Sequence, residues 1–186
     1  MGKDRKESVL DKAENIILKE GLQALTIRNI CACADIALSS FYVFFKSKQA
    51  LIDEVYLRAQ ARMIDGCYFT HPEKTPFESY MLNTKRYIKN AQKYPKDFFF
   101  VRQFRNSPSV SGELFYDEDY ALGPRRLSEL VADGVFANLS VVEVNAILTG
   151  AVDELIFAQL RGRIKITEAT AENFIRQLWK AAAKSD

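Results

Sequence analysis

Hydroxyl groups and basic side chains recur between residues 26 and 48 in a pattern that suits the binding of a phosphate polymer rather than catalysis. Such groups bind phosphate oxygens and also reach base edges in a DNA groove. The polar candidates are Thr26, Arg28, Ser39, Ser40, Tyr42 and Lys48, and the apolar ones are Leu38, Val43 and Phe44. Leu38 is suited to contact with a thymine methyl group. We expect this set to contact double-stranded DNA.

Two short helices joined by a tight turn are predicted to position these residues. The first shows apolar residues at helical spacing, namely Ile27, Ile30 and Ala34. Thr26 precedes it, and its hydroxyl can accept a hydrogen bond from an unpaired N–H group of the first turn. Asp35 tolerates a left-handed backbone and marks the turn. In the second helix Phe41 and Phe45 are four residues apart, so they share one buried face.

The outward face of the second helix, within residues 38–44, is too apolar for a surface that contacts only water. It therefore predicts a binding partner. The flanking Lys46 and Lys48 favour a partner that carries phosphates. An apolar protein is the alternative partner. The chain would then be a helical protein-protein interaction module whose association is insensitive to salt.

The same segment resembles a known family signature. The matching residues run Ile30-x-x-x-Ala34-x-Ile36-x-x-x-Ser40-Phe41-Tyr42-x-x-Phe45-x-Ser47-Lys48-x-x-Leu51, with Gly21 and Thr26 upstream. This pattern closely resembles that of the TetR/AcrR family of transcriptional regulators. The resemblance implies an all-helical homodimer whose N-terminal domain reads DNA and whose C-terminal domain binds a small effector. It also implies that Thr26, Tyr42 and Lys48 bind phosphates and that Arg28 reaches a base edge.

Two residues depart from the family pattern. Asp35 stands where the family usually has Gly, and Ala37 stands where it usually has a capping Ser or Thr. Loss of such a cap typically costs about 0.5–2 kcal/mol. We therefore expect the second helix to be partly frayed until phosphate oxygens, or Ser39 and Ser40, complete its first turn.

Length and composition predict an all-α protein of about nine helices. The chain has 186 residues, 48% of them apolar, so it can bury a core, and eight Gly and five Pro are too few for a loop-rich β fold. Residues 1–52 hold eight Lys and Arg against six Asp and Glu, so the net charge of +2 lies in this part. We expect a three-helix helix-turn-helix DNA-binding head at 1–52 and a helical effector-binding and dimerisation body at 53–186.

Periodicity and helix breakers place the other helices. Gly21 ends the first helix, residues 47–65 form a connector that leads out of the head, and Thr75-Pro76 opens the next helix. An aromatic-rich helix follows Pro95, and Gly123-Pro124 forces a break. Two long helices are predicted at about 140–162 and 167–184.

The two C-terminal helices are predicted to form a dimer interface. The first is apolar or small on two faces, so it must contact more than its own subunit. Paired across a twofold axis, the two helices would form a four-helix interface. The interface candidates are Ala146, Gly150, Asp153, Phe157, Phe174, Leu178 and Trp179. The alternatives are an ordinary core and, for Asp153, a pair with Arg161 or with a residue of the other subunit.

Aromatic residues of the body could line an effector pocket. Aromatic walls with few polar groups suit a small lipophilic or aromatic ligand. The candidates are Tyr80, Tyr87, Phe100, Phe104, Tyr116 and Tyr120, with Arg102 to bind a ligand carboxylate. Aromatic residues at such spacing are also typical of a plain core.

The sequence predicts no enzyme, no metal site and no cofactor. Its one histidine, His71, lies in a loop, and it has neither an HExxH motif nor a phosphate-cradling glycine loop. Cys31 and Cys33 point to different sides of a helix, which disfavours a disulfide or a metal pair. Cys33 and Cys67 are predicted to be small buried hydrophobes, with a redox role as the alternative. With no secretory signal and no apolar run that could cross a bilayer, we expect a cytoplasmic protein.

Together these features predict a ligand-responsive, sequence-specific transcriptional regulator. We favour a repressor that binds a (pseudo)palindromic operator, with activation as the alternative. Effector binding in the body would shift the connector helix and change the separation of the two recognition helices of the dimer.

Overall fold

The computed structural model describes residues 2–67, 73–105 and 118–184, and of residues 2, 3 and 118–124 it describes only the backbone. Across these ranges the chain is helical and contains no strand beyond an isolated bridge between Phe136 and Ala183. The all-α prediction is confirmed. The chain divides into two compact units: unit 1 comprises Met1–Met63 and Lys96–Val110, and unit 2 comprises Ile64–Pro95 and Ser111–Asp186. Within the described parts, no single helix has the length and apolar content needed to span a membrane.

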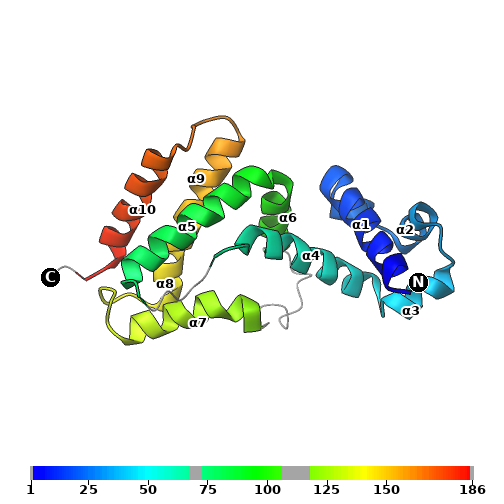
Figure 1. Cartoon of the computed structure of the whole chain (residues 1–186), viewed down its shortest axis with the longest axis horizontal. Helices are drawn as coiled ribbons and strands as arrows, with labels where there is room; N and C mark the ends of the chain where they lie inside the picture. Colours follow the sequence, from blue (N-terminus) through cyan, green and yellow to red (C-terminus); the bar gives the residue numbers. More distant parts are fainter. Residues whose placement is uncertain (1, 68–72, 106–117, 185–186) are drawn as a thin grey trace. The chain divides into compact units, whose positions relative to one another are not determined.

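Unit 1 holds the predicted helix-turn-helix. Its elements are α1 (Gly2–Glu20), the 3-10 turn η1 (Leu22–Ala24), α2 (Ile27–Ala34), α3 (Leu38–Phe44), α4 (Lys48–Ile64) and α6 (Pro95–Arg105) (Figure 1). Gly21 ends α1 with a φ of 88°, and its N–H donates to the carbonyl of Ile17 at 3.0 Å. Each of these α-helices contributes fully or nearly fully buried side chains, among them Val9, Ile30, Phe41, Val55 and Phe98.

Unit 2 is built around α5, which packs against both α9 and α10, together with three shorter or flanking elements. The bounds are α5 (Pro76–Lys93), α7 (Glu118–Ala132), α8 (Val141–Asn145), the π turn η3 (Ala146–Gly150), α9 (Ala151–Leu160) and α10 (Glu168–Ala182) (Figure 1). Thr75 and Glu78 form a reciprocal capping box at the start of α5, so the predicted helix start is confirmed. Phe136, Val144, Leu148 and Ala182 form a buried cluster.

Two features of unit 2 differ from the sequence-based expectation. The predicted break at Gly123-Pro124 is wrong, because α7 runs through both residues. Proline removes one helical hydrogen bond at a cost of about 3 kcal/mol, but Leu127, Leu130 and Val131 beyond it pack on the buried cluster and offset that loss. The predicted helix at 140–162 contains the π turn η3, which the apolar spacing does not distinguish from a continuous α-helix.

Candidate nucleic-acid interface

The helices α2 and α3 meet through the tight turn that the sequence predicts. The Thr26 hydroxyl caps α2 by accepting a hydrogen bond from the N–H of Asn29 at 3.1 Å. Asp35 adopts the left-handed conformation, with φ 50° and ψ 54°. The helices are bent by 100° at this break, within the range of about 90–120° found for helix-turn-helix pairs.

Aromatic packing holds α3 in place. Phe41 and Phe45 are 0% and 1% exposed, and their ring centroids lie 5.5 Å apart, so their predicted core role is confirmed. Ala37 precedes α3 and provides no side-chain cap, as expected because its methyl group cannot accept a hydrogen bond. The helix nevertheless begins at Leu38 in the structure, where packing of Phe41 against the core stabilises the first turns.

The opposite side of α3 points to solvent. Val43 is 80% exposed, Leu38 56% and Tyr42 53%, and Ser39 is exposed as well. We call these four side chains the α3 face; Ser40 and Phe44 flank it and are half-buried. The Tyr42 ring meets the Phe41 ring edge to face, with centroids 5.4 Å apart, so the buried ring orients the exposed one.

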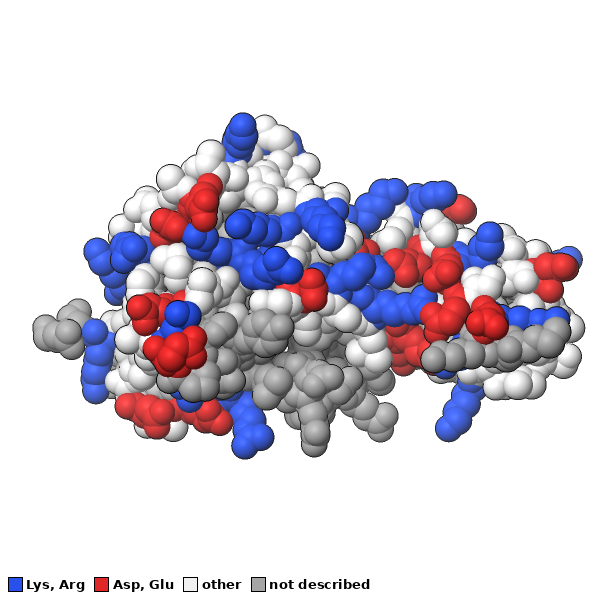
Figure 2. All heavy atoms as spheres, viewed as in Figure 1, with Lys and Arg blue, Asp and Glu red and all other residues white. Residues whose placement is uncertain are grey.

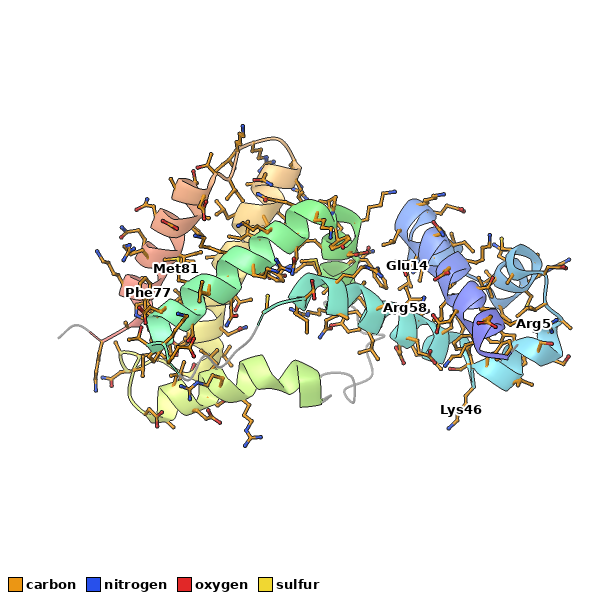
Figure 3. All side chains as sticks on the ribbon, in the orientation of Figure 1. Arg5, Glu14, Lys46, Arg58, Phe77 and Met81 are labelled. Carbon is orange, nitrogen blue, oxygen red and sulfur yellow. The ribbon has the colours of Figure 1, made fainter. Side chains whose placement is uncertain are left out.

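Three cations lie near the ends of α2 and α3. Arg28 and Lys46 are exposed, and Figure 3 shows Lys46 projecting away from the helices. Lys48 is half-buried in the first turn of α4, where the Ser47 hydroxyl accepts from the N–H of Ala50 at 3.0 Å. A lysine at this positive end of a helix dipole is unfavourable unless an anion approaches it. Lys46 is absent from the predicted contact set, although its position just after α3 was a usable signal.

Two arginines and a lysine elsewhere in unit 1 are bound by carboxylates. Arg62 of α4 donates to both oxygens of Asp97 of α6, at 2.6 and 3.0 Å, and also binds Glu14 of α1. Asp97 is only 4% exposed. Its hydrogen bonds raise the pKa of Arg62, whereas burial raises the pKa of Glu14. We call this triad of Glu14, Arg62 and Asp97 the clamp, because it ties α1, α4 and α6 together.

A second set of ion pairs joins α1 to α4. Arg58 binds Glu7 and, at 2.9 Å, Asp11, and Lys6 binds Glu54 at 2.8 Å. Acidic and basic side chains are interspersed on this part of unit 1 (Figure 2), and Glu14 and Arg58 are labelled in Figure 3. These cations are therefore engaged within the protein, unlike those beside the α3 face.

The residues predicted to bind an effector are divided between the two units. In unit 1, Phe104 stacks on Tyr56 with centroids 4.6 Å apart, and Phe100 packs on Phe104 at 5.8 Å. Arg102, also in unit 1, is half-buried. In unit 2 the hydroxyls of Tyr80 and Tyr87 donate to the Leu148 carbonyl at 2.8 Å and to Asp153 at 3.0 Å.

Burial raises the pKa of Tyr80 well above its usual range, so this hydroxyl remains protonated. Tyr116 and the side chain of Tyr120 lie outside the described residues. The effector set therefore stays a prediction.

The residues predicted for the dimer interface differ in their surroundings. Asp153 is 1% exposed and accepts from Tyr87 of its own chain, so it is not available to a second copy in this conformation. The alternative pair of Asp153 with Arg161 is wrong, since Arg161 lies over the Phe157 ring at 5.6 Å. Trp179 packs on Phe136 with centroids 5.2 Å apart.

Leu178 and Trp179 pack beside the buried cluster of unit 2 and are half-buried, so each keeps part of its surface exposed. Ala146 is exposed, and Gly150, Phe157 and Phe174 are half-buried. With Leu178 and Trp179, these residues keep the predicted interface a prediction.

The burial of the cysteines bears on their predicted roles. Cys31 is buried and Cys33 exposed, as expected for opposite sides of α2, so the predicted burial of Cys33 is wrong. Burial raises the pKa of the Cys67 thiol to about 11, which leaves little reactive thiolate at neutral pH. His71 lies outside the described residues. Among the residues that the structure does describe, no group of His, Cys, Asp and Glu could hold a metal ion.

Comparisons with known proteins agree with this geometry. The family model described as bacterial regulatory proteins, tetR family, matches residues 9–55, which run from within α1 to the first half of α4. No curated protein sequence matches the chain.

Solved structures of similar fold cover nearly the whole chain. A TetR family transcription regulator from Marinobacter aquaeolei VT8 has a TM-score of 0.83 and 14% identity, over 98% of this chain and 97% of that one. A TetR-family regulator from Haemophilus influenzae has a TM-score of 0.75 and 19% identity, with 98% of both chains covered. The flavonoid-responsive regulator FrrA has a TM-score of 0.72 and 22% identity, over 97% of this chain and 98% of that one.

Proposed function

Because residues 9–55 form a tetR-family domain and the chain has the fold of TetR family transcription regulators, we propose that it represses transcription as a DNA-binding homodimer. We further propose that a small lipophilic or aromatic effector releases it from a (pseudo)palindromic operator. The observation that carries the DNA-binding proposal is the α3 face, an exposed surface on a short helix that buried Phe41 and Phe45 hold rigidly. A helix presented in this way fits the major groove.

The proposed contacts follow from the position of each side chain. Tyr42, Thr26 and Lys48 bind phosphates, and Lys46 joins them because it projects into solvent beside α3. Arg28 and Ser39 reach base edges. Leu38 and Val43 contact thymine methyl groups, which suits their exposure of 56% and 80%. Ser40 and Phe44, both half-buried, contribute at the edge of this surface.

A dimer is proposed because one recognition helix reads only a half-site. Two half-sites in successive major grooves lie about 34–36 Å apart, so two copies are needed to bind both. We place the interface on α8, η3, α9 and α10 of unit 2. The residues available for it are exposed Ala146 and half-buried Gly150, Phe157, Phe174, Leu178 and Trp179.

The DNA-binding proposal is tested by fluorescence anisotropy with DNA that flanks the protein's own coding region. Binding should weaken steeply with salt, and Lys48→Ala should weaken it on every sequence and flatten the salt slope by about 1. Lys180→Ala, an exposed lysine on α10, is the matched control and should leave the slope unchanged. No binding at low salt would refute the proposal. Salt-insensitive association with a protein through the α3 face would instead support the interaction-module alternative.

Effector release is tested separately. Native mass spectrometry of the purified protein would identify a co-purified ligand, and adding that ligand should lower operator affinity. A ligand that binds and leaves operator affinity unchanged would contradict the proposed release.

A further inference from the structure

A cavity of about 220 Å³ opens on unit 1 between the C-terminal end of α1 and the helix α6. Ile17, Leu18 and Leu22 form its wall on the α1 side. Phe99 and Phe100 form the wall on the α6 side, where Lys96 and Gln103 add polar groups. Phe100, which the sequence analysis predicts to bind an effector, therefore lines a cavity.

The lining of this cavity suits an apolar ring that carries one negative charge. Its walls are aliphatic on one side and aromatic on the other, and Phe99 is 37% exposed. Within the described residues, neither the Lys96 ammonium nor the Gln103 amide forms an ion pair or a hydrogen bond. Both groups are therefore available to bind a carboxylate.

The volume limits the size of the ligand. Pockets for drug-sized molecules span about 300–1,000 Å³, and this cavity of about 220 Å³ is smaller. A ligand of one or two fused rings is the size that it can hold.

We propose that this cavity binds a small aromatic carboxylate and that its occupancy lowers the affinity of the protein for DNA. The ring lies between the walls of α1 and α6, and the carboxylate binds Lys96 and Gln103. The part of this inference that concerns DNA rests on the proposed function, whereas the binding site itself does not.

The clamp provides the physical link between the cavity and the α3 face. Asp97 follows Lys96 directly on α6, is 4% exposed and binds Arg62, which also binds Glu14 on α1. The clamp therefore fixes the spacing of α1 and α6, the two helices between which the ligand inserts. Because α1 packs on α2, a change in this spacing reaches the helix-turn-helix.

The site is tested by isothermal titration of the full chain with naphthalene carboxylate and with the neutral naphthalene methanol. The carboxylate should bind, and Lys96→Gln should weaken its binding about tenfold, because a charge-assisted contact is lost. Lys93→Gln, an exposed lysine that lies over the Tyr94 ring and outside the cavity, should leave binding unchanged. The neutral alcohol should bind weakly and equally to the native chain and to Lys96→Gln. Leu18→Phe, which fills the cavity, should abolish binding of the carboxylate.

The outcomes separate this inference from the proposed function. Absence of binding, or binding that Lys96→Gln and Leu18→Phe leave unchanged, would overturn the site while DNA binding stays intact. Binding at Lys96 that leaves the affinity for operator DNA unaltered would overturn the regulatory part. A chain that binds the carboxylate at Lys96 but no DNA at all would support the site and refute the proposed function.

Discussion

Two surfaces of unit 1 use charged residues in opposite ways. On the side where α1, α4 and α6 meet, Arg58 and Arg62 are bound by carboxylates, and Asp97 is 4% exposed. Beside the α3 face, Lys46 forms no ion pair with any described residue, and Val43 is 80% exposed. The charges of the first surface are paired within one chain, whereas the charge of Lys46 on the second is not.

The difference shows why net charge is a poor guide to this surface. Residues 1–52 carry only a small excess of positive charge, and some of their cations, such as Lys6, are already bound to carboxylates. The α3 face differs in that its apolar side chains are exposed and the nearby Lys46 forms no ion pair with a described residue. Paired charges position helices, and unpaired charges remain available to phosphates.

The largest effect is expected from removing the support of the α3 face. Phe41→Ala deletes a fully buried ring that contacts the rings of Tyr42 and Phe45, so it should destabilise unit 1 by about 3–5 kcal/mol. Val43→Ala, at an 80% exposed position, should change stability by less than about 0.5 kcal/mol and still weaken DNA binding. Urea denaturation and anisotropy measure the two effects. Equal stability losses in the two variants would contradict the division of α3 into a buried and a free side.

The next effect is expected at the clamp. Asp97→Ala removes the partner of Arg62 on α6 and should cost about 1–3 kcal/mol, since the carboxylate is buried while the Arg62 side chain is 30% exposed. Asp11→Ala is the matched control, because its side chain is 67% exposed and its pair with Arg58 should contribute at most about 1 kcal/mol. Urea denaturation compares both variants with the native chain. A loss for Asp11→Ala as large as that for Asp97→Ala would show that burial does not distinguish the two pairs.

A smaller effect distinguishes free from engaged lysines. Lys46→Ala should lower the salt slope of DNA binding by about 1, because each phosphate contact releases about one counterion. Lys6→Ala should lower it less, since Lys6 already binds Glu54 at 2.8 Å and lies over the Phe45 ring. Anisotropy titrations at several salt concentrations measure both slopes. A larger change in the salt slope for Lys6→Ala than for Lys46→Ala would contradict this prediction.

Local signals allowed most of the helix-turn-helix to be predicted from sequence. The Thr26 cap, the left-handed Asp35 and the buried pair Phe41 and Phe45 each depend on residues within a few positions of one another. The π turn η3 and the passage of α7 through Pro124 depend on packing between distant segments, which periodicity does not report.

The clamp and the cavity could not be predicted for the same reason. Arg62 and Asp97 are far apart in sequence, and Asp97 resembles any solvated acid at the start of a helix until its burial is known. Likewise, Asp153 looked suited to an interface because an apolar helix carries it, but the hydroxyl of Tyr87 satisfies it inside unit 2.

The smallest effect is expected in the pH dependence of stability that Glu14 contributes. It shows whether Glu14 behaves as part of an ion pair or as a buried acid. Burial raises its pKa above the usual 4.5 in spite of Arg62. The folded state then holds the proton more tightly than the unfolded state, so the contribution of Glu14 to stability is full below about pH 4.5 and is lost as the pH rises through the folded-state pKa. The stability of the native chain relative to Glu14→Gln should therefore fall with rising pH, by less than about 1 kcal/mol in urea denaturation between pH 4 and 7. Glu20→Gln, at an exposed position on α1, should show no such trend. If the stability of the native chain relative to Glu14→Gln instead rises with pH, the attraction of Arg62 outweighs burial. The clamp would then be strongest, not weakest, at the pH where all its carboxylates are charged.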